Sequence, residues 1–153
     1  MDYIKELRAL VGHRPLLLGG CGAYIVRDHM VLLQRRLDNG LWAAHGGIME
    51  PGESTEETMI REIEEETGLI VKDYTFLCVT SGKEVHLIYP NGDECYFINV
   101  VYLVTDFEGT LNPQDCEVAE LRCFGFDELP DESEISPADR PSYRILKAHL
   151  GIA

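Results

Sequence analysis

One helix of this chain is bounded at both ends by residues that start and stop helices. Ser54 followed by Glu57 forms a capping box, which predicts a helix that begins at Thr55. Gly68, with an apolar residue behind it, predicts that the helix ends at Thr67. The side that should face the core carries this set: Met59, Ile60, Ile63 and Thr67. The other side is strongly acidic, so the chain must fold with one face of this helix buried and a concentrated negative charge on the opposite face.

The acidic side of this helix gathers three carboxylates in a small volume. Glu62, Glu65 and Glu66 stand at i, i+3 and i+4, so their Cβ atoms lie roughly 5–6 Å apart. At about 6 Å, two such charges repel by about 3 kcal/mol at an effective dielectric near 20. Acidic runs on exposed helices are common solvated faces, so the triple alone favours no function. A hard divalent cation such as Mg²⁺ or Mn²⁺ would remove the repulsion, because such ions prefer carboxylate oxygens.

The residues just before the helix add two further features. Gly46 and Gly47 are adjacent, and paired glycines permit unusual backbone angles, which indicates a shaped loop. Glu53 at the helix entrance and Arg61 eight residues later are suited to a salt bridge that ties the loop to the helix. On its own, such a pair is structural more often than it is catalytic.

Taken together, these residues resemble the signature of a known family. With x for any residue, the segment reads Gly47-x5-Glu53-x7-Arg61-Glu62-Ile63-x-Glu65-Glu66-x-Gly68-Leu69. This order matches every position of the 23-residue box of the Nudix hydrolases, G-x5-E-x7-R-E-U-x-E-E-x-G-U, where U is aliphatic. Three other segments also resemble a Nudix domain: residues 32–36, the loop around Trp42 and residues 127–130. The resemblance therefore extends along most of the chain.

The resemblance implies both a fold and an activity. The fold is α/β (α+β by some schemes), a Nudix-type α/β/α sandwich with a central mixed β-sheet. The activity is that of a pyrophosphohydrolase, which hydrolyses the diphosphate that links a nucleoside to another group. The implied cofactor is Mg²⁺, with Mn²⁺ as the alternative.

The resemblance also assigns roles to residues of the box. It implies four metal ligands: the main-chain carbonyl of Gly46 and the carboxylates of Glu62, Glu65 and Glu66. Glu53 and Arg61 correspond to the orienting salt bridge of the box. The implied catalytic set is Glu65, Glu66, Glu53 and Arg61.

Two aspects of the site stay open at this level. Members of the family often recruit one more carboxylate from a later loop as a ligand or general base, and the candidates here are Glu117 and Glu120. Relatives commonly carry proline just before the paired glycines, whereas this chain has His45. His45 is either a histidine held in a turn or a hydrogen-bond partner of a phosphate or substrate.

The substrate is open among three interpretations. Residues 89–93 are similar to a subgroup labelled ADP-ribose pyrophosphatase-like, although the same residues also make a simple turn. We therefore expect hydrolysis of a nucleoside diphosphate derivative, with an ADP-ribose-like compound favoured. The alternatives are a (d)NTP or oxidised-nucleotide pyrophosphohydrolase and a non-catalytic nucleotide-binding Nudix module. Four aromatic residues could stack on a base, although each also suits the core or a hairpin: Tyr24, Trp42, Phe76 and Tyr89.

The remaining segments predict strands and two further helices around one mixed sheet. Ile4, Leu7 and Leu10 or Val11 recur at helical spacing and Gly12 follows, which predicts an N-terminal helix. Strands are expected over these residues: 16–18, 21–26, 30–35, 74–81, 84–89, 95–105 and 121–126. Asn91 and Gly92 should supply positive φ angles between the strands at 84–89 and 95–105. A closing helix should carry Pro141 in its first turn and this apolar stripe: Ile145, Leu146 and Leu150.

Length and composition exclude several other classes of protein. The 153 residues suit a single domain spanning 1–153. The net charge of −14 disfavours a nucleic acid polymer as partner and favours a small nucleotide derivative. No apolar run approaches the ~20 residues of a membrane helix, and the first residues lack a signal peptide, so we expect a cytoplasmic protein without a membrane partner. The five cysteines show no C-x-x-C spacing and suit a reduced core, and a homodimer is left open.

Overall fold

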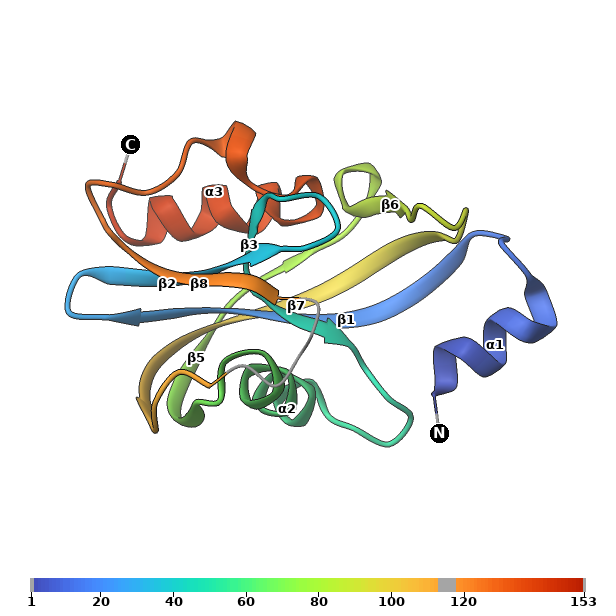
Figure 1. The fold of residues 1–153 in the computed structure, drawn as a ribbon, viewed down its shortest axis with the longest axis horizontal. Coiled ribbons are helices and arrows are strands. Elements are labelled where there is room, and N and C mark those ends of the chain that lie inside the picture. Colours follow the sequence, from blue (N-terminus) through green and yellow to red (C-terminus); the bar gives the residue numbers. More distant parts are fainter. Residues whose placement is uncertain (1, 113–117, 153) are drawn as a thin grey trace.

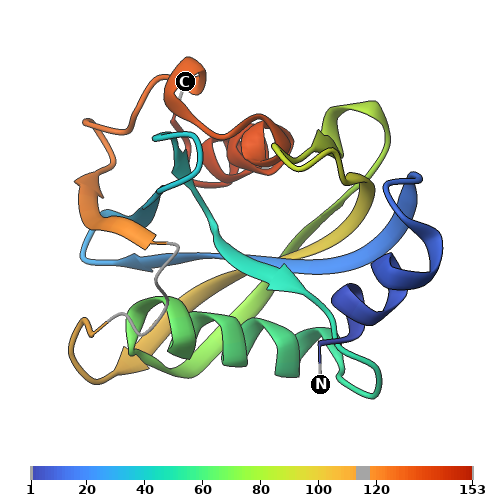
Figure 2. The ribbon, with the colours of Figure 1, turned by 45° about the vertical axis from the view of Figure 1, so that its right-hand side comes forward.

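A mixed β-sheet of eight strands separates two of the helices in a computed structural model that describes residues 2–112 and 118–152. The helices are α1 (Tyr3–Val11), α2 (Thr55–Thr67) and α3 (Arg140–His149), with short 3-10 helices η1 (Lys83–Val85), η2 (Glu132–Glu134) and η3 (Pro137–Asp139). The strands are β1 (Leu16–Arg27), β2 (Met30–Arg36), β3 (Trp42–Ala43), β4 (His45–Ile48), β5 (Ile70–Thr80), β6 (His86–Ile88), β7 (Glu94–Glu108) and β8 (Val118–Gly125). Helix α2 covers one face of the sheet and α3 the other, while α1 lies beside one end (Figure 1; Figure 2).

This arrangement confirms the predicted α/β/α sandwich with a mixed sheet. The strand order is β3-β2-β1-β7-β5, with β4 paired to β1, β6 to β7 and β8 to β2. The β1–β7 pair is parallel and the other pairs between these strands are antiparallel. The sheet thus places the short strand β4, which follows β3 along the chain, next to the central strand β1.

Strand β1 is longer than the sequence pattern predicts. The separate strand expected at residues 16–18 is the first part of β1, which continues through the glycines that follow. A Cβ at Gly20 would meet the side-chain oxygen of Asn99 on the neighbouring strand β7, so a larger residue there would displace the Asn99 side chain. The hairpin from β1 to β2 is confirmed, and both residues of its turn, Asp28 and His29, have positive φ angles of 52° and 60°.

The region between β5 and β7 differs from the prediction in two ways. The expected strand over residues 84–89 is instead η1 followed by the shorter strand β6. In the loop before β7, only Gly92 has a positive φ, of 92°, so the prediction for Asn91 was wrong. The side chain of Asn91 instead accepts the N–H of Asp93 at 2.9 Å, which closes the turn with a local hydrogen bond.

The core lies on both faces of the sheet. On the α2 face, Met59 and Ile63 pack with residues of β1 and β7, as the helical pattern predicted. On the α3 face, Tyr143 and Leu146 are fully buried, whereas Ile145 is 39% exposed and does not belong to the predicted apolar stripe. Tyr143 and Leu146 are three residues apart and therefore lie on the same side of α3. The Tyr143 hydroxyl donates to the Pro130 carbonyl at 2.6 Å.

The described cysteines are free, and most are in the core. Cys21, Cys78 and Cys95 are buried, Cys123 is exposed, and Cys116 lies outside the described residues. Burial raises the pKa of the Cys21 thiol to about 11. Over residues 2–112 and 118–152, none of the helices has the length and apolar character needed to cross a bilayer.

Candidate active site

Helix α2 is fixed at both ends in the way its sequence predicts. The Ser54 hydroxyl accepts the N–H of Glu57 at 3.1 Å, and the Glu57 carboxylate accepts the N–H of Ser54 at 2.8 Å. Gly68 ends the helix with a left-handed φ of 79°. A Cβ at Gly68 would also lie 2.7 Å from the carbonyl oxygen of Asn112, so this position admits only glycine without strain. The caps hold the acidic face of α2 toward strand β4.

The three glutamates of this face line one groove but lie in different surroundings. The side chain of Glu66 is 6% exposed, that of Glu62 13% and that of Glu65 50%. The groove has a volume of about 1110 Å³ and also borders Gly46 and Gly47. The structure thus brings together the four positions implied as metal ligands.

Glu66 is held in place by polar groups behind it. Its Oε2 accepts the side-chain amide of Gln34 at 2.8 Å and the N–H of Gly46 at 3.2 Å. The Gln34 amide also donates to the Ala44 carbonyl at 2.9 Å, so one side chain connects β2, the residue before β4 and α2. Such a bonded carboxylate has little rotational freedom, as a group that positions a ligand requires.

His45 lies behind the same glutamate, which answers the question left open by the sequence. It is fully buried on β4, and its Nε2–H donates to the Leu32 carbonyl at 3.0 Å. Its Nδ1 lies 3.5 Å from Oε2 of Glu66. His45 is therefore a buried strand residue rather than a histidine held in an exposed turn, and among the described residues its Nδ1 has no hydrogen-bond partner.

Arg61 and Glu53 form the predicted salt bridge with two parallel contacts. The Nε and Nη2 groups of Arg61 donate to the two oxygens of Glu53 at 2.7 and 2.9 Å. Arg61 also donates from Nη1 to Glu62 at 2.9 Å. The guanidinium lowers the pKa of Glu53 to about 2, chiefly through these hydrogen bonds. The pair therefore ties the loop before α2 to the helix and orients the neighbouring Glu62.

Glu62 is a glutamate of the groove whose carboxyl pKa is clearly raised. Burial raises the pKa of its carboxyl to about 7, and the charge of Glu66 acts in the same direction, whereas Arg61 opposes the shift. The Glu62 carboxylate also fills the space beside Gly47, where a Cβ would lie 2.5 Å from its Cδ. A side chain at position 47 would thus displace the Glu62 carboxylate.

The donor chemistry fits a hard divalent cation. Carboxylate and carbonyl oxygens are the ligands that Mg²⁺ takes in proteins. The pKa of Glu62 is raised first by burial and then by the charge of Glu66, and a cation would offset the second of these effects. Within the described ranges, no three acidic, histidine or cysteine side chains already stand as a complete set of metal ligands. The fit therefore rests on the kind of donors and on the groove they share.

The additional carboxylate expected from a later loop is not brought to this groove by the described residues. Glu117 lies outside them. Glu120 lies on β8, where its Oε1 accepts both Nε and Nη2 of Arg122 at 3.0 and 2.6 Å. Its Oε2 lies 3.6 Å from Arg35 of the paired strand β2, and Glu120 is not among the residues that line the groove.

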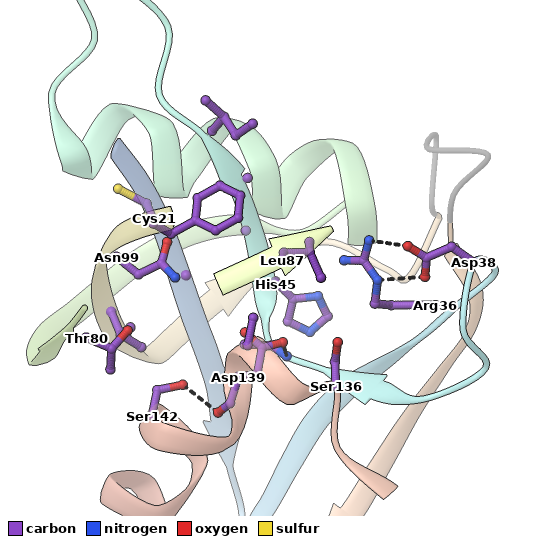
Figure 3. A pocket seen from close by; sticks show the side chains of 18 of the residues that line it. Cys21, Arg36, Asp38, His45, Thr80, Leu87, Asn99, Ser136, Asp139 and Ser142 are labelled. Atoms are coloured by element: carbon purple, nitrogen blue, oxygen red, sulfur yellow. Dashed lines mark hydrogen bonds and ion pairs between the residues drawn. The ribbon is translucent and has the colours of Figure 1, made fainter. Parts of the chain in front are cut away.

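A separate cavity of about 290 Å³ adjoins the groove along β4. Figure 3 shows His45 in its wall, with Asn99 and Thr80 on one side and Arg36, paired with Asp38, on the other. Gly46 and Gly47 border both the groove and the cavity, so the two spaces meet at the backbone of β4. The size and mixed lining of the cavity suit one ring system of a small ligand.

Asp139 is a half-buried acid that lines this cavity, and no sequence pattern indicated it. Its Oδ2 accepts the N–H of Ala44 at 3.2 Å. Burial raises the pKa of its carboxyl to about 6; Arg36 and the Ala44 N–H act against the shift, and Glu66 adds to it. Ser142 lies beside it, and its hydroxyl is within 2.9 Å of the Tyr24 hydroxyl. Asp139 and Asn99 come from segments far from the box, with no spacing that links them.

Of the four aromatic candidates for base stacking, one lines the groove and the cavity. Tyr24 and Trp42 are buried in the core, where no ring face is open to a ligand. Phe76 is exposed on β5 but lines neither the groove nor the cavity. Tyr89 lines both spaces.

Comparison with known proteins agrees with this geometry. The family described as NUDIX domain matches residues 18–146 of the chain. The chain is 36% identical over 109 residues to an ADP-ribose pyrophosphatase of Methanocaldococcus jannaschii, with 69% of the chain and 60% of that protein covered. It is 32% identical over 130 residues to the nucleoside triphosphatase NudI of Salmonella heidelberg, with 79% of the chain and 83% of that protein covered.

Further similarity extends to longer proteins and to solved structures. An NAD-capped RNA hydrolase, NudC of Vibrio parahaemolyticus, is 28% identical over 127 residues, and the alignment covers 82% of the chain and 44% of that protein. Among the first relatives, the chain thus spans less than two thirds of their own length. The crystal structure of a MutT NUDIX hydrolase from Burkholderia pseudomallei superposes with a TM-score of 0.71 at 31% identity, covering 86% of this chain and 98% of that one. Since the family match covers most of the chain and includes the box and β4, the chain belongs to the NUDIX domain family.

Proposed function

We propose that this protein hydrolyses the diphosphate linkage of a nucleoside diphosphate derivative, with an ADP-ribose-like compound favoured, in a reaction that depends on Mg²⁺ or Mn²⁺. One observation carries the proposal. The groove that is lined by the three glutamates of α2 adjoins a cavity large enough for one ring system, and strand β4 borders both. A diphosphate placed over Gly46 and Gly47 would reach the glutamates, while its nucleoside occupies the cavity. The similarity to an ADP-ribose pyrophosphatase supports the same substrate class.

Each residue of the groove has a part in this proposal. The carboxylates of Glu62, Glu65 and Glu66 and the carbonyl of Gly46 hold the cation. When bound, the cation neutralises charge on the diphosphate and makes water a stronger nucleophile at neutral pH. Glu65 is the most exposed of the three carboxylates and is placed to take the proton from the attacking water. The Glu53–Arg61 pair keeps the loop and Glu62 in register with the helix.

The reaction needs no covalent participation from the protein. In-line attack of water on one phosphorus breaks the bond to the bridging oxygen, which leaves with the other phosphate. The protein supplies position and electrostatic compensation, which are the two contributions that phosphoryl transfer requires.

The proposal is tested by release of phosphate or nucleotide with Mg²⁺ and then Mn²⁺. The substrates are ADP-ribose, other nucleotide sugars, CDP-alcohols, dinucleoside polyphosphates and all (d)NTPs. We expect metal-dependent turnover with a preference for a diphosphate between two groups. Glu65→Gln and Glu66→Gln should each reduce turnover by more than about a hundredfold, since each removes a charge that the chemistry uses. Glu64→Gln is the matched control, because Glu64 is exposed on the same helix and does not line the groove.

A second function is favoured by a different observation. The relative NudI, of which the chain covers 83%, is a nucleoside triphosphatase, so (d)NTP or oxidised-nucleotide hydrolysis is the alternative. A preference for (d)NTPs in the same panel would select it. Nucleotide binding without turnover in any metal would instead identify a non-catalytic binding module.

A further inference from the structure

Helix α1 lies before the residues matched to the family, yet it borders the groove that holds the glutamates. The family match begins at residue 18, whereas α1 spans Tyr3–Val11. Residues 2–4 line the same groove as the three glutamates of α2. Both ribbon views place the start of α1 next to the loop that joins β4 to α2 (Figure 1; Figure 2). Helix α1 thus adds a wall of its own to the groove.

This wall is held by a nearly buried arginine. The side chain of Arg8 is 10% exposed, and its Nη2 donates to the Glu94 carbonyl at 2.7 Å and to the Cys95 sulfur at 3.3 Å. These contacts join α1 to the start of β7. Ile4 adds an apolar contact, because it packs against a small core cluster that includes Cys95 and Phe97. The first turn of α1 therefore stands at a fixed place beside the groove.

The chemistry of this wall suits an uncharged ring and disfavours a phosphate. Tyr3 is 41% exposed, and with Ile4 and Pro90 it gives the groove an aromatic and apolar side. The carboxylate of Asp2 accepts the N–H of Lys5 at 3.2 Å, so a negative charge already caps the helix start where an anion would otherwise bind.

The positively charged side chains that line the groove are already paired with carboxylates. Among its described lining residues, the cations are Arg36 and Arg61. Arg36 donates to both oxygens of Asp38 at 2.8 and 2.7 Å, and Arg61 is bound to Glu53 and Glu62. A terminal phosphate next to α1 would therefore meet carboxylates and an apolar surface.

We propose that α1 binds the second ring of the substrate, the group across the diphosphate from the nucleoside, and that the Tyr3 ring packs against it. The inference rests on the proposed function, because it assigns the other half of the same substrate. It narrows the substrate class to a diphosphate flanked by a ring on each side, such as a nucleoside diphosphate sugar or a dinucleotide. A (d)NTP carries only phosphate on that side and would gain nothing from this wall.

The test compares a two-ring and a one-ring compound in variants of α1. With ADP-ribose, Tyr3→Ala should raise KM about tenfold, which corresponds to about 1.4 kcal/mol, because the variant loses the contact with the second ring. With dATP, the same variant should leave KM unchanged. Tyr3→Phe keeps the ring and should behave as the wild type, while Arg8→Ala should reproduce the Tyr3→Ala effect by releasing α1. Leu10→Ala is the control, because Leu10 is 84% exposed on α1 and does not line the groove.

The outcomes separate this inference from the proposed function. Equal changes of KM for ADP-ribose and dATP, or no change in Tyr3→Ala, would overturn the role of α1 while turnover still supports hydrolysis. Absence of metal-dependent turnover in the wild type would count against the proposed function. In that case, calorimetric titration with ADP-ribose tests whether α1 binds the second ring. An equal Kd for the wild type and Tyr3→Ala would overturn this role of α1.

Discussion

At the scale of single residues, the two adjacent glycines of β4 are required for different reasons. A Cβ at Gly46 would lie 2.8 Å from the Gly22 Cα of the paired strand β1, so its obstacle is backbone. A Cβ at Gly47 would meet the carboxylate of Glu62, which is the far end of a flexible side chain. The first glycine therefore serves the fold, and the second serves the position of one carboxylate.

These two positions give opposite predictions for the same substitution. Gly46→Ala should lower the melting temperature markedly, because the sheet has to open to admit the methyl group. Gly47→Ala should leave the melting temperature within a few degrees and reduce turnover at least tenfold, since Glu62 is displaced. Thermal unfolding by circular dichroism and the hydrolysis assay check both. Unchanged turnover in folded Gly47→Ala would contradict the role given to Glu62.

Asp139 makes stability depend on pH. Burial raises its pKa to about 6, so between about pH 4 and pH 6 the folded protein holds a proton that the unfolded chain has lost. The contribution of this group to stability is therefore greatest at low pH and decreases as pH rises through this window. The decrease is at most about 3 kcal/mol, from a shift of about two units at 1.36 kcal/mol each.

The variant Asp139→Asn tests this directly. Asparagine keeps an oxygen acceptor for the Ala44 N–H but carries no charge, so we expect a higher melting temperature than the wild type at pH 8 and a smaller difference at pH 5. Thermal unfolding followed by circular dichroism at the two pH values measures this difference. A variant that is less stable than the wild type at pH 8 would show that the charged form is stabilised in the fold.

At the scale of elements, helix α2 depends on its caps. Ser54→Ala removes the hydroxyl that accepts the Glu57 N–H, and it should reduce the free energy of unfolding by about 1 kcal/mol. The three glutamates of the groove stand about two to three turns further along the helix, so turnover at low temperature should stay close to that of the wild type. Ser81→Ala, at an exposed serine that follows β5, is the control for loss of a hydroxyl. Loss of turnover in folded Ser54→Ala would mean that the cap also determines the positions of the glutamate side chains.

The same element shows how far the sequence determines the site. The bounds of α2 and the Glu53–Arg61 pair were predictable, because caps and an eight-residue separation are local properties. Of the predicted core positions, Met59, Ile63 and Thr67 are buried and Ile60 is half-buried. The burial of Thr58 and Glu66 was not predicted, because it comes from the strands packed against the helix. The cavity was not predictable from such patterns. Asp139 and Asn99 lie 40 residues apart and line one cavity only because the fold brings η3 and β7 to it.

The strand and loop errors have a similar origin. Residues 84–89 are apolar and β-prone, yet their first part forms η1, where Val85 is fully buried in the cluster with Leu18 and Phe97. Ile145 fits a helical stripe in sequence, but the α3 face that meets the sheet is set by Tyr143 and Leu146. In both cases tertiary packing chose among alternatives that local propensity allows equally.

At the scale of the whole molecule, the net charge of −14 makes cation binding a stabilising event. A ligand that binds the folded state alone adds RT ln(1 + [L]/Kd), about 2.7 kcal/mol at one hundred times Kd. We therefore expect excess Mg²⁺ to raise the melting temperature beyond the effect of Na⁺ at equal ionic strength. The excess should shrink in Glu66→Gln and persist in Glu64→Gln. Equal shifts with Mg²⁺ and Na⁺ would indicate general screening without a metal site.

The position of strand β4 allows ligand recognition to change in evolution separately from the reaction. One side of this strand meets the glutamates of α2, and the other meets a cavity built from β7, η3 and α3. Substitutions at Asn99 or Ser142 can therefore alter which ligand is admitted without touching the helix that performs the reaction. Selection can act on recognition and on chemistry as separate traits, because a single thin strand divides the segments that encode them.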